Sequence, residues 1–148
     1  MNGGRSTSLY IDTSVLLKLF FPEPESARAA RIVHEETDIL VSSLTRLEAL
    51  VQIQAREVGG LITAAKARER RTRLALLLYH APFRFEAYSL PPIEIAERQL
   101  SNSSIYCPTL DRLHLAAMES LKVRRLLTND ESQASAARAL GFEVILPR

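Results

Sequence analysis

Four acidic residues stand at positions where a divalent metal ion could be bound: Asp12, Glu48, Asp111 and Asp130. Asp12 and Asp130 each follow an apolar stretch typical of a buried strand, whereas Glu48 and Asp111 fall in the opening turns of expected helices. In a parallel sheet, the carboxyl ends of the strands and the starts of the following helices share one edge. We therefore expect all four carboxylates to meet at that edge.

Such a group of acids predicts a particular chemistry. Carboxylates that lie close together repel one another, and some become protonated unless a cation lies between them. Their oxygens suit Mg²⁺ or Mn²⁺, and the sequence holds no cluster of histidine or cysteine that would favour zinc. A bound Mg²⁺ or Mn²⁺ can activate water and neutralise a phosphodiester. The acids therefore predict hydrolysis of a nucleic-acid backbone without a protein nucleophile, with one ion or two.

Three of the acids also have a simpler explanation when each is taken alone. Asp12 could cap the helix that follows it. Asp111 could be an acid that the helix dipole favours in a first turn. Asp130 could be a helix cap, with Thr128-x-x-Glu131 as a competing capping box. Only the joint placement of the acids favours a metal site over these local roles.

Glu48 lies on a helix that is expected to begin at residue 43 or 44 and to end at Val58. Its neighbours in sequence are apolar, so its carboxylate should be partly desolvated and should need a partner. The alternative is a capping box between Thr45 and Glu48. The apolar stripe expected to face the core on this helix is Leu44, Leu47, Val51, Ala55 and Val58.

Strand and helix patterns alternate along the chain. The expected strands span residues 8–11, 38–42, 83–90, 125–127 and 142–146. The expected helices span residues 13–21, 23–36, 43–58, 61–80, 93–103, 109–122 and 131–140. This alternation predicts one α/β domain over residues 1–148, with a parallel sheet and helices on both faces. The two long helices on either side of Gly59-Gly60 predict an antiparallel helical hairpin.

The composition fits a single globular domain of 148 residues, 47% hydrophobic and 24% charged. Its one cysteine, Cys107, excludes a disulfide within the chain and fits a reducing cytosol. We interpret Cys107 as a packed residue rather than a nucleophile. No apolar run approaches the ~20 residues that cross a bilayer, and residues 1–8 lack a signal-peptide core, so we expect a cytoplasmic protein without a membrane segment. The net charge of +2 is compatible with nucleic-acid binding but does not indicate it alone.

The acids lie within four short segments that are informative together. In chain order they are Tyr10-Ile11-Asp12-Thr13-Ser14, Thr45-Arg46-Leu47-Glu48, Leu110-Asp111-Arg112-Leu113-His114-Leu115-Ala116 and Leu127-Thr128-Asn129-Asp130. In this order and spacing they resemble the motifs of PIN-domain proteins, most of all VapC-type toxins of bacterial toxin–antitoxin pairs. The resemblance covers nearly the whole chain.

The resemblance implies a three-layer α/β/α fold around a five-stranded parallel sheet in the order 3-2-1-4-5, with all 148 residues in one PIN-like domain. It implies an endoribonuclease that uses Mg²⁺ or Mn²⁺ and gives the four acids metal-site roles. The hydroxyl groups of Thr13, Ser14 and Thr128 would support those acids from a second layer. It further implies an RNA substrate, a homodimer and a small antitoxin whose tail fills the active-site groove.

Two apolar features have more than one interpretation. His114 falls on the apolar face of its helix, and we interpret it as a hydrogen-bonded core residue rather than a catalytic base. Residues 74–78 are apolar around much of their helix, which exceeds one core-facing stripe. We expect part of this segment to pack against a second chain in a dimer. The alternative is a helix buried within the monomer.

Basic side chains near the acids are also open to two interpretations. Lys66, Arg70 and Arg73 form one stripe on a helix, where they could bind phosphate or form a solvated face. Arg46 and Arg112 lie beside two of the acids in the sequence. Each could contact an RNA backbone or an antitoxin carboxylate, or could be an ordinary surface charge.

Other functions compete with a toxin nuclease. A PIN nuclease of RNA processing outside any toxin pair would carry the same residues. A non-catalytic RNA- or protein-binding module of this fold would bind without metal-dependent cleavage. A phosphoacceptor signalling domain needs paired acids after its first strand and a lysine after its last. Here one acid follows the first strand, and the lysines Lys18, Lys66 and Lys122 lie on expected helices.

Overall fold

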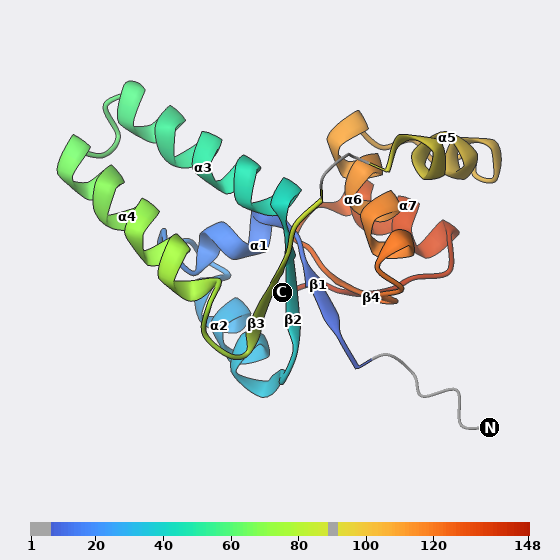
Figure 1. Cartoon of the computed structure of the whole chain (residues 1–148), viewed down its shortest axis with the longest axis horizontal. Coiled ribbons are helices and arrows are strands. Elements are labelled where there is room, and N and C mark those ends of the chain that lie inside the picture. The colour runs from blue at the N-terminus through green and yellow to red at the C-terminus, as the bar shows by residue number, and fades with distance from the viewer. Residues whose placement is uncertain (1–6, 89–91) are drawn as a thin grey trace.

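A five-stranded parallel sheet forms the centre of the computed structural model, which describes residues 7–88 and 92–148 (Figure 1). Its strands are β1 (Leu9–Ile11), β2 (Ile39–Ser42), β3 (Phe83–Glu86), β4 (Arg125–Leu127) and β5 (Glu143–Ile145). They lie in the order β3-β2-β1-β4-β5, and each neighbouring pair is parallel. The predicted α/β class and strand order are therefore confirmed.

Seven helices connect these strands within the described ranges. They are α1 (Thr13–Lys18), α2 (Ser26–Glu35), α3 (Ser43–Val58), α4 (Ala64–Leu77), α5 (Ile93–Ser101), α6 (Thr109–Ser120) and α7 (Glu131–Ala139). The predicted hairpin of α3 and α4 projects beyond the sheet on one side, whereas α5, α6 and α7 gather on the other (Figure 1). Across residues 7–88 and 92–148, no helix is both long enough and apolar enough to cross a membrane.

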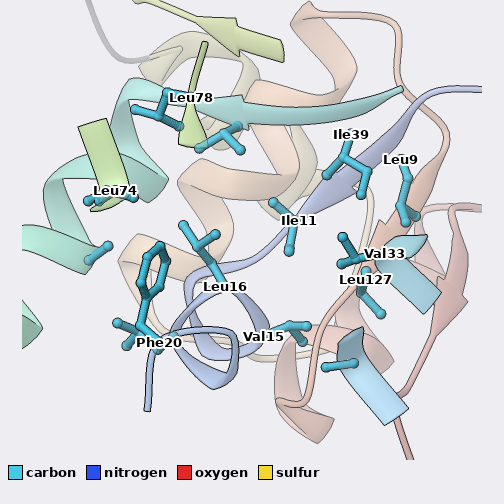
Figure 2. Packing of buried hydrophobic residues seen from close by; sticks show 14 residues of the cluster. Leu9, Ile11, Val15, Leu16, Phe20, Val33, Ile39, Leu74, Leu78 and Leu127 are labelled. Atoms are coloured by element: carbon cyan, nitrogen blue, oxygen red, sulfur yellow. The ribbon is translucent and has the colours of Figure 1, made fainter. Parts of the chain in front are cut away.

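The sheet is apolar on both faces because helices cover both of them. Leu9 and Ile11 of β1 point into one core cluster, which they share with buried residues of α1, α2, α3 and α4 (Figure 2). Tyr10, between them, belongs to a second cluster with residues of α6 and α7. The predicted three-layer arrangement is therefore present, and Asp12 follows the strand that contributes to both clusters.

The helices α1 and α2 are shorter than expected. α1 ends at Lys18 and α2 begins at Ser26, so Pro24 precedes the helix and does not lie in its first turn. Lys18 is buried, and its amine forms ion pairs with Glu23 at 2.5 Å and with Glu25 at 2.9 Å. These ion pairs involve two residues of the connection between α1 and α2, and α2 begins only after them, at Ser26.

Other element ends also differ from the expected ones. α4 begins at Ala64 because Thr63 caps it, accepting the N–H of Lys66 at 3.1 Å. α6 ends at Ser120, shortly before Lys122 takes a left-handed φ of +59°. β3 ends four residues earlier than expected, at position 86, and residues 89 and 90 of the predicted strand lie outside the described ranges.

The apolar stripe predicted for α3 is wrong. Four of its five members are exposed: Leu47 at 57%, Val51 at 49%, Val58 at 83%, and Ala55. The residues that α3 buries instead are Thr45, Ala49 and Ile53. The small side chain of Ala49 lets this face approach the first core cluster closely. The outer part of α3 projects beyond the sheet together with α4 (Figure 1). Apolar residues on the outer side of α3 therefore lie away from the sheet and stay exposed.

The apolar segment at residues 74–78 is partly buried within the monomer. Leu74 and Leu78 are buried in the first core cluster (Figure 2). Leu76 is 57% exposed. Burial within the monomer, the alternative considered for this segment, explains Leu74 and Leu78. Ala75 and Leu76 are exposed, so the expectation that part of the segment packs against a second chain stays a prediction.

Candidate active site

Asp12 and Asp130 follow β1 and β4 at the carboxyl edge of the sheet. Asp12 caps α1, where its Oδ2 accepts the N–H of Ser14 at 3.3 Å. Asp130 caps α7, where its Oδ1 accepts the N–H of Gln133 at 3.0 Å. The capping role considered for each acid is confirmed, and the competing box that begins at Thr128 does not form. Each cap uses only one of the two carboxylate oxygens.

Glu48 and Asp111 reach the same edge from α3 and α6. α3 is capped by Ser42, whose Oγ accepts the N–H of Thr45 at 3.2 Å, so the capping box between Thr45 and Glu48 is wrong. The Glu48 carboxylate instead accepts a hydrogen bond from Thr13 Oγ1 of α1 at 3.1 Å, as expected for a supporting hydroxyl. Asp111 lies in the first turn of α6 and is half-buried.

The surroundings of Asp111 include the other three acids. Its pKa is raised to about 6, first by burial and then by the negative charges of Asp12, Asp130 and Glu48, while His114 lowers it. Contacts in the structure join the other three acids: His114 Nε2 contacts Glu48 and lies 3.7 Å from Asp12 Oδ1, and the Thr128 hydroxyl donates to Asp12 and accepts the N–H of Asp130. Asp111 lies in the first turn of α6, three residues before His114. All four predicted acids therefore lie at one edge of the sheet.

Two hydroxyl groups support the acids that follow the strands. Ser14 Oγ donates to Asp12 Oδ2 at 2.7 Å and accepts the N–H of Asn129 at 3.1 Å. Thr128 Oγ1 donates to the same oxygen of Asp12 at 3.2 Å and accepts the N–H of Asp130 at 3.0 Å. These contacts join the turn after β1 to the turn after β4, and the supporting role of both hydroxyl groups at a metal site stays a prediction.

His114 belongs to the site, although its sequence position predicts only a core residue. It is fully buried and its Nδ1 lies 2.6 Å from the Tyr10 hydroxyl, so the interpretation as a hydrogen-bonded core residue is confirmed. Its Nε2, however, is hydrogen-bonded to Glu48 and lies 3.7 Å from Asp12 Oδ1. The signal in the sequence is its i, i+3 spacing from Asp111, which places both side chains on one face of α6.

The acids also change the charge state of the His114 ring. Burial alone would lower its pKa, but the hydrogen bond to Glu48 and the charges of Asp12, Glu48 and Asp111 outweigh burial and raise the pKa. The acids therefore shift the ring toward its charged form relative to a free imidazole. In that form the ring offsets part of the negative charge at this edge of the sheet.

The acidic residues fit a hard divalent cation by their chemistry, but they are not yet arranged around one. In the part of the chain that the structure describes, no three histidine, cysteine, aspartate or glutamate side chains form a ready-made metal-binding group. Glu48 is instead hydrogen-bonded to His114, and Asp12 to Ser14. Burial and the neighbouring negative charges together raise the pKa of Asp111, and a cation at this edge would offset both effects.

The basic stripe on α4 is largely occupied by contacts within the protein. Lys66 pairs with Glu69 at 3.1 Å, and Arg70 pairs with the same carboxylate at 3.2 Å. The guanidinium of Arg73 lies over the ring of Phe20, 5.1 Å from its centroid. These contacts favour the solvated helix face over a phosphate site.

The other residues with open roles are also placed by the structure. The guanidinium of Arg46 lies 4.4 Å from the centroid of the Phe85 ring. Arg112 is not a surface charge, because it is only 3% exposed and donates from Nη2 to the carbonyl of Ile105 at 3.1 Å. Cys107 is buried, and burial raises the pKa of its thiol, which supports its interpretation as a packed residue.

Comparison with known proteins connects this geometry to one family. A family model described as the PIN domain matches residues 9–139. The chain is 30% identical over 147 residues to ribonuclease VapC46 of Mycobacterium tuberculosis, and the match covers 95% of this chain and 98% of that protein. The match therefore includes all of the acids described above.

Solved structures share the fold. The chain resembles VapC20 of Mycobacterium tuberculosis, described as a toxin that cleaves the sarcin-ricin loop, with a TM-score of 0.69, 16% identity and coverage of 90% of this chain and 95% of that one. It also resembles VapBC2 from Rickettsia felis, solved with a DNA fragment from its promoter, with a TM-score of 0.66, 11% identity and coverage of 94% and 98%. At these identities the likeness concerns the fold.

Proposed function

This chain belongs to the PIN-domain family, and from that premise we propose that it is an endoribonuclease that hydrolyses RNA phosphodiester bonds with the help of Mg²⁺ or Mn²⁺. The observation that supports the proposal is the placement of four acids at the carboxyl edge of the sheet, two of them directly after β1 and β4 and two on the opening turns of α3 and α6. Burial, and after it the charges of the other three acids, raises the pKa of Asp111 to about 6. The similarity to a protein named as a ribonuclease supports the choice of reaction and of RNA as the substrate.

Asp12, Glu48, Asp111 and Asp130 would hold the cation. When bound, it would lower the pKa of a coordinated water and neutralise charge on the phosphodiester. The protein itself orients the acids: Asp12, Glu48 and Asp130 each have one carboxylate oxygen that accepts hydrogen bonds from neighbouring residues. Asp12 has its Oδ2 held by hydroxyl groups, so its Oδ1 is the oxygen available to a ligand.

We further propose that the protein acts as the toxin of a toxin–antitoxin pair in the cytoplasm. The support is its similarity to VapC46 and its fold likeness to a toxin and to a toxin–antitoxin complex. A small antitoxin would then be its natural partner, and a homodimer its natural assembly. A small protein encoded beside it that co-purifies with it and suppresses cleavage would support this role. A nuclease of RNA processing would lack such a partner.

The decisive experiment measures cleavage of a labelled RNA by the purified chain with Mn²⁺, with Mg²⁺ and with EDTA. We expect cleavage with either cation, none with EDTA, and recovery when excess cation is restored. Asp12→Asn, which keeps an oxygen for the helix cap, should reduce cleavage by more than about 100-fold, since changes behind metal ligands alone reduce activity by about 10- to 100-fold.

The matched control is Glu97→Gln, a change of an exposed acid on α5 that should leave cleavage unchanged. Cleavage that survives both EDTA and Asp12→Asn would contradict the metal-dependent mechanism. Binding of RNA without cleavage under any of these conditions would instead favour a non-catalytic module of the same fold.

A further inference from the structure

A continuous chain of hydrogen bonds leads from the end of β2 through β1 to Glu48. The hydroxyl groups of Ser42 and Tyr10 lie 2.7 Å apart, and the Tyr10 hydroxyl lies 2.6 Å from His114 Nδ1. The other ring nitrogen of His114, Nε2, is hydrogen-bonded to Oε1 of Glu48. Ser42, Tyr10 and His114 are fully buried, so Glu48 alone connects this chain to the surface.

The orientation of the His114 ring is fixed from both ends. An ionised carboxylate only accepts hydrogen bonds, so Nε2 must carry the proton that points at Glu48. Nδ1 then meets Tyr10 either as an acceptor or, in the charged ring, as a donor. Turning the ring over would break both hydrogen bonds in a place that water does not reach, which is unfavourable. Nε2 therefore faces Glu48 in either charge state.

One oxygen of Glu48 receives both of its protein hydrogen bonds. Oε1 accepts from Thr13 Oγ1 at 3.1 Å and from His114 Nε2. Among the described residues, Oε2 accepts none. The same division recurs at Asp12, where Oδ2 is held by Ser14 and Thr128. At both acids the protein therefore holds one oxygen and leaves the other available.

We propose that His114 is a positioning residue, which Tyr10 holds in place and which, together with Thr13, fixes Oε1 of Glu48 so that Oε2 alone is presented to the cation. This inference rests on the proposed function of the site. It assigns no proton transfer to His114 during the reaction. The positioning role also gives a reason for the hydrogen-bonded chain of buried Ser42, Tyr10 and His114 to end at Glu48.

Two substitutions of His114 separate this role from simple packing. Glutamine places an amide nitrogen near the position of Nε2 and can still donate to Glu48, whereas asparagine places its amide near Nδ1 and cannot reach that acid. His114→Asn should reduce kcat/KM and Mn²⁺ affinity by about 10- to 100-fold, in line with residues that orient metal ligands. His114→Gln should recover most of that loss. If both variants lose activity in proportion to their fall in Tm, the positioning role is overturned.

A double-mutant cycle tests whether His114 acts through Glu48. In a Glu48→Ala background, His114→Asn should cause little further loss of activity, because the residue that it positions is gone. Losses that multiply across the two sites would show that His114 acts by another route.

Two measurements do not depend on RNA cleavage. Mn²⁺ affinity of the wild type and of His114→Asn can be compared by electron paramagnetic resonance of the free ion. In the metal-free protein, the hydrogen-bonded Nε2–H should give a downfield proton NMR signal that is lost in Glu48→Ala and retained in Tyr10→Phe. Unchanged Mn²⁺ affinity, or a signal insensitive to Glu48→Ala, overturns the positioning role. Absence of cleavage by the wild type with intact Mn²⁺ binding would instead overturn the proposed function.

Discussion

At the scale of single residues, Asp111 differs from its three acidic neighbours. Asp12, Glu48 and Asp130 each have an oxygen held by a hydrogen bond, whereas the Asp111 carboxylate accepts none from the described residues. It is half-buried among negative charges, which raises its pKa to about 6. In the metal-free protein, its ionised form therefore destabilises the fold.

This predicts that Asp111→Asn stabilises the metal-free protein near pH 7.5. The gain should be about 1 kcal/mol after allowance for solvent screening, which corresponds to roughly 2–4 °C in Tm. A carboxyl whose pKa is higher in the folded state loses stability as the pH rises from its ordinary pKa through about 6. The gain should therefore shrink between pH 7.5 and pH 4. Calorimetry in EDTA measures it, and an equal gain at both pH values would contradict the prediction.

The acids were predictable from the sequence and their supporting hydroxyl groups from the family resemblance, but which acid each hydroxyl group contacts, and the part played by His114, were not. Acids after strands and at helix starts must converge in a parallel sheet, and they do so here. The contacts of Thr13 and His114 with Glu48 depend on how α1, α3 and α6 pack against one another. Local sequence patterns do not specify that packing.

At the scale of elements, α3 is the helix whose buried face is hardest to predict from the sequence. It carries apolar residues on more than one side, so periodicity alone does not decide which side faces the core. Packing selects the face with the small Ala49, and Leu47 and Val51 are left at the surface. Two hollows on this surface have both apolar and polar linings, the apolar part from α3 being Leu44, Leu47, Leu50 and Val51. Large exposed apolar patches on soluble proteins often form contacts with other chains.

The exposed face of α3 predicts where the proposed homodimer forms. Leu47→Glu combined with Val51→Glu should convert a dimer into a monomer, because two charges would be buried in the interface. Light scattering after size-exclusion chromatography measures the mass. Leu76→Glu on α4 is the control, since Leu76 is equally exposed but lies on a different helix. A dimer that persists in the double variant with an unchanged Tm would contradict this placement.

At the scale of the whole molecule, the acids come from both sides of the sheet. Asp12 and Glu48 belong to elements beside the first core cluster, whereas Asp111 and Asp130 open α6 and α7 beside the second. A cation shared by the acids would therefore link two halves of the molecule. The strand order that produces this arrangement followed from the family resemblance, since alternation of strands and helices leaves many parallel orders open.

The whole-molecule arrangement predicts that the cation stabilises the fold. A ligand that binds only the folded state at 100 times its Kd adds about 2.7 kcal/mol, which raises Tm by about 5–10 °C for a domain of this size. Mn²⁺ should give such a shift in the wild type and in Glu97→Gln, and a much smaller one in Asp12→Asn or Asp130→Asn. Differential scanning fluorimetry measures the shifts. An equal shift in all four proteins would show that the ion binds elsewhere.

The neighbouring hydroxyl groups of Thr13 and Ser14 face opposite halves of the molecule. Thr13 donates to Glu48 on α3, and Ser14 accepts from the backbone of Asn129 in the turn before α7. The two adjacent residues at the start of α1 thus connect α3 on one side of the sheet to the turn before α7 on the other. Separating these two parts of the molecule would break both hydrogen bonds. We therefore expect a large substrate to bind without separation of these two parts of the molecule, because separating them would break the hydrogen bonds that orient Glu48 and Asp12.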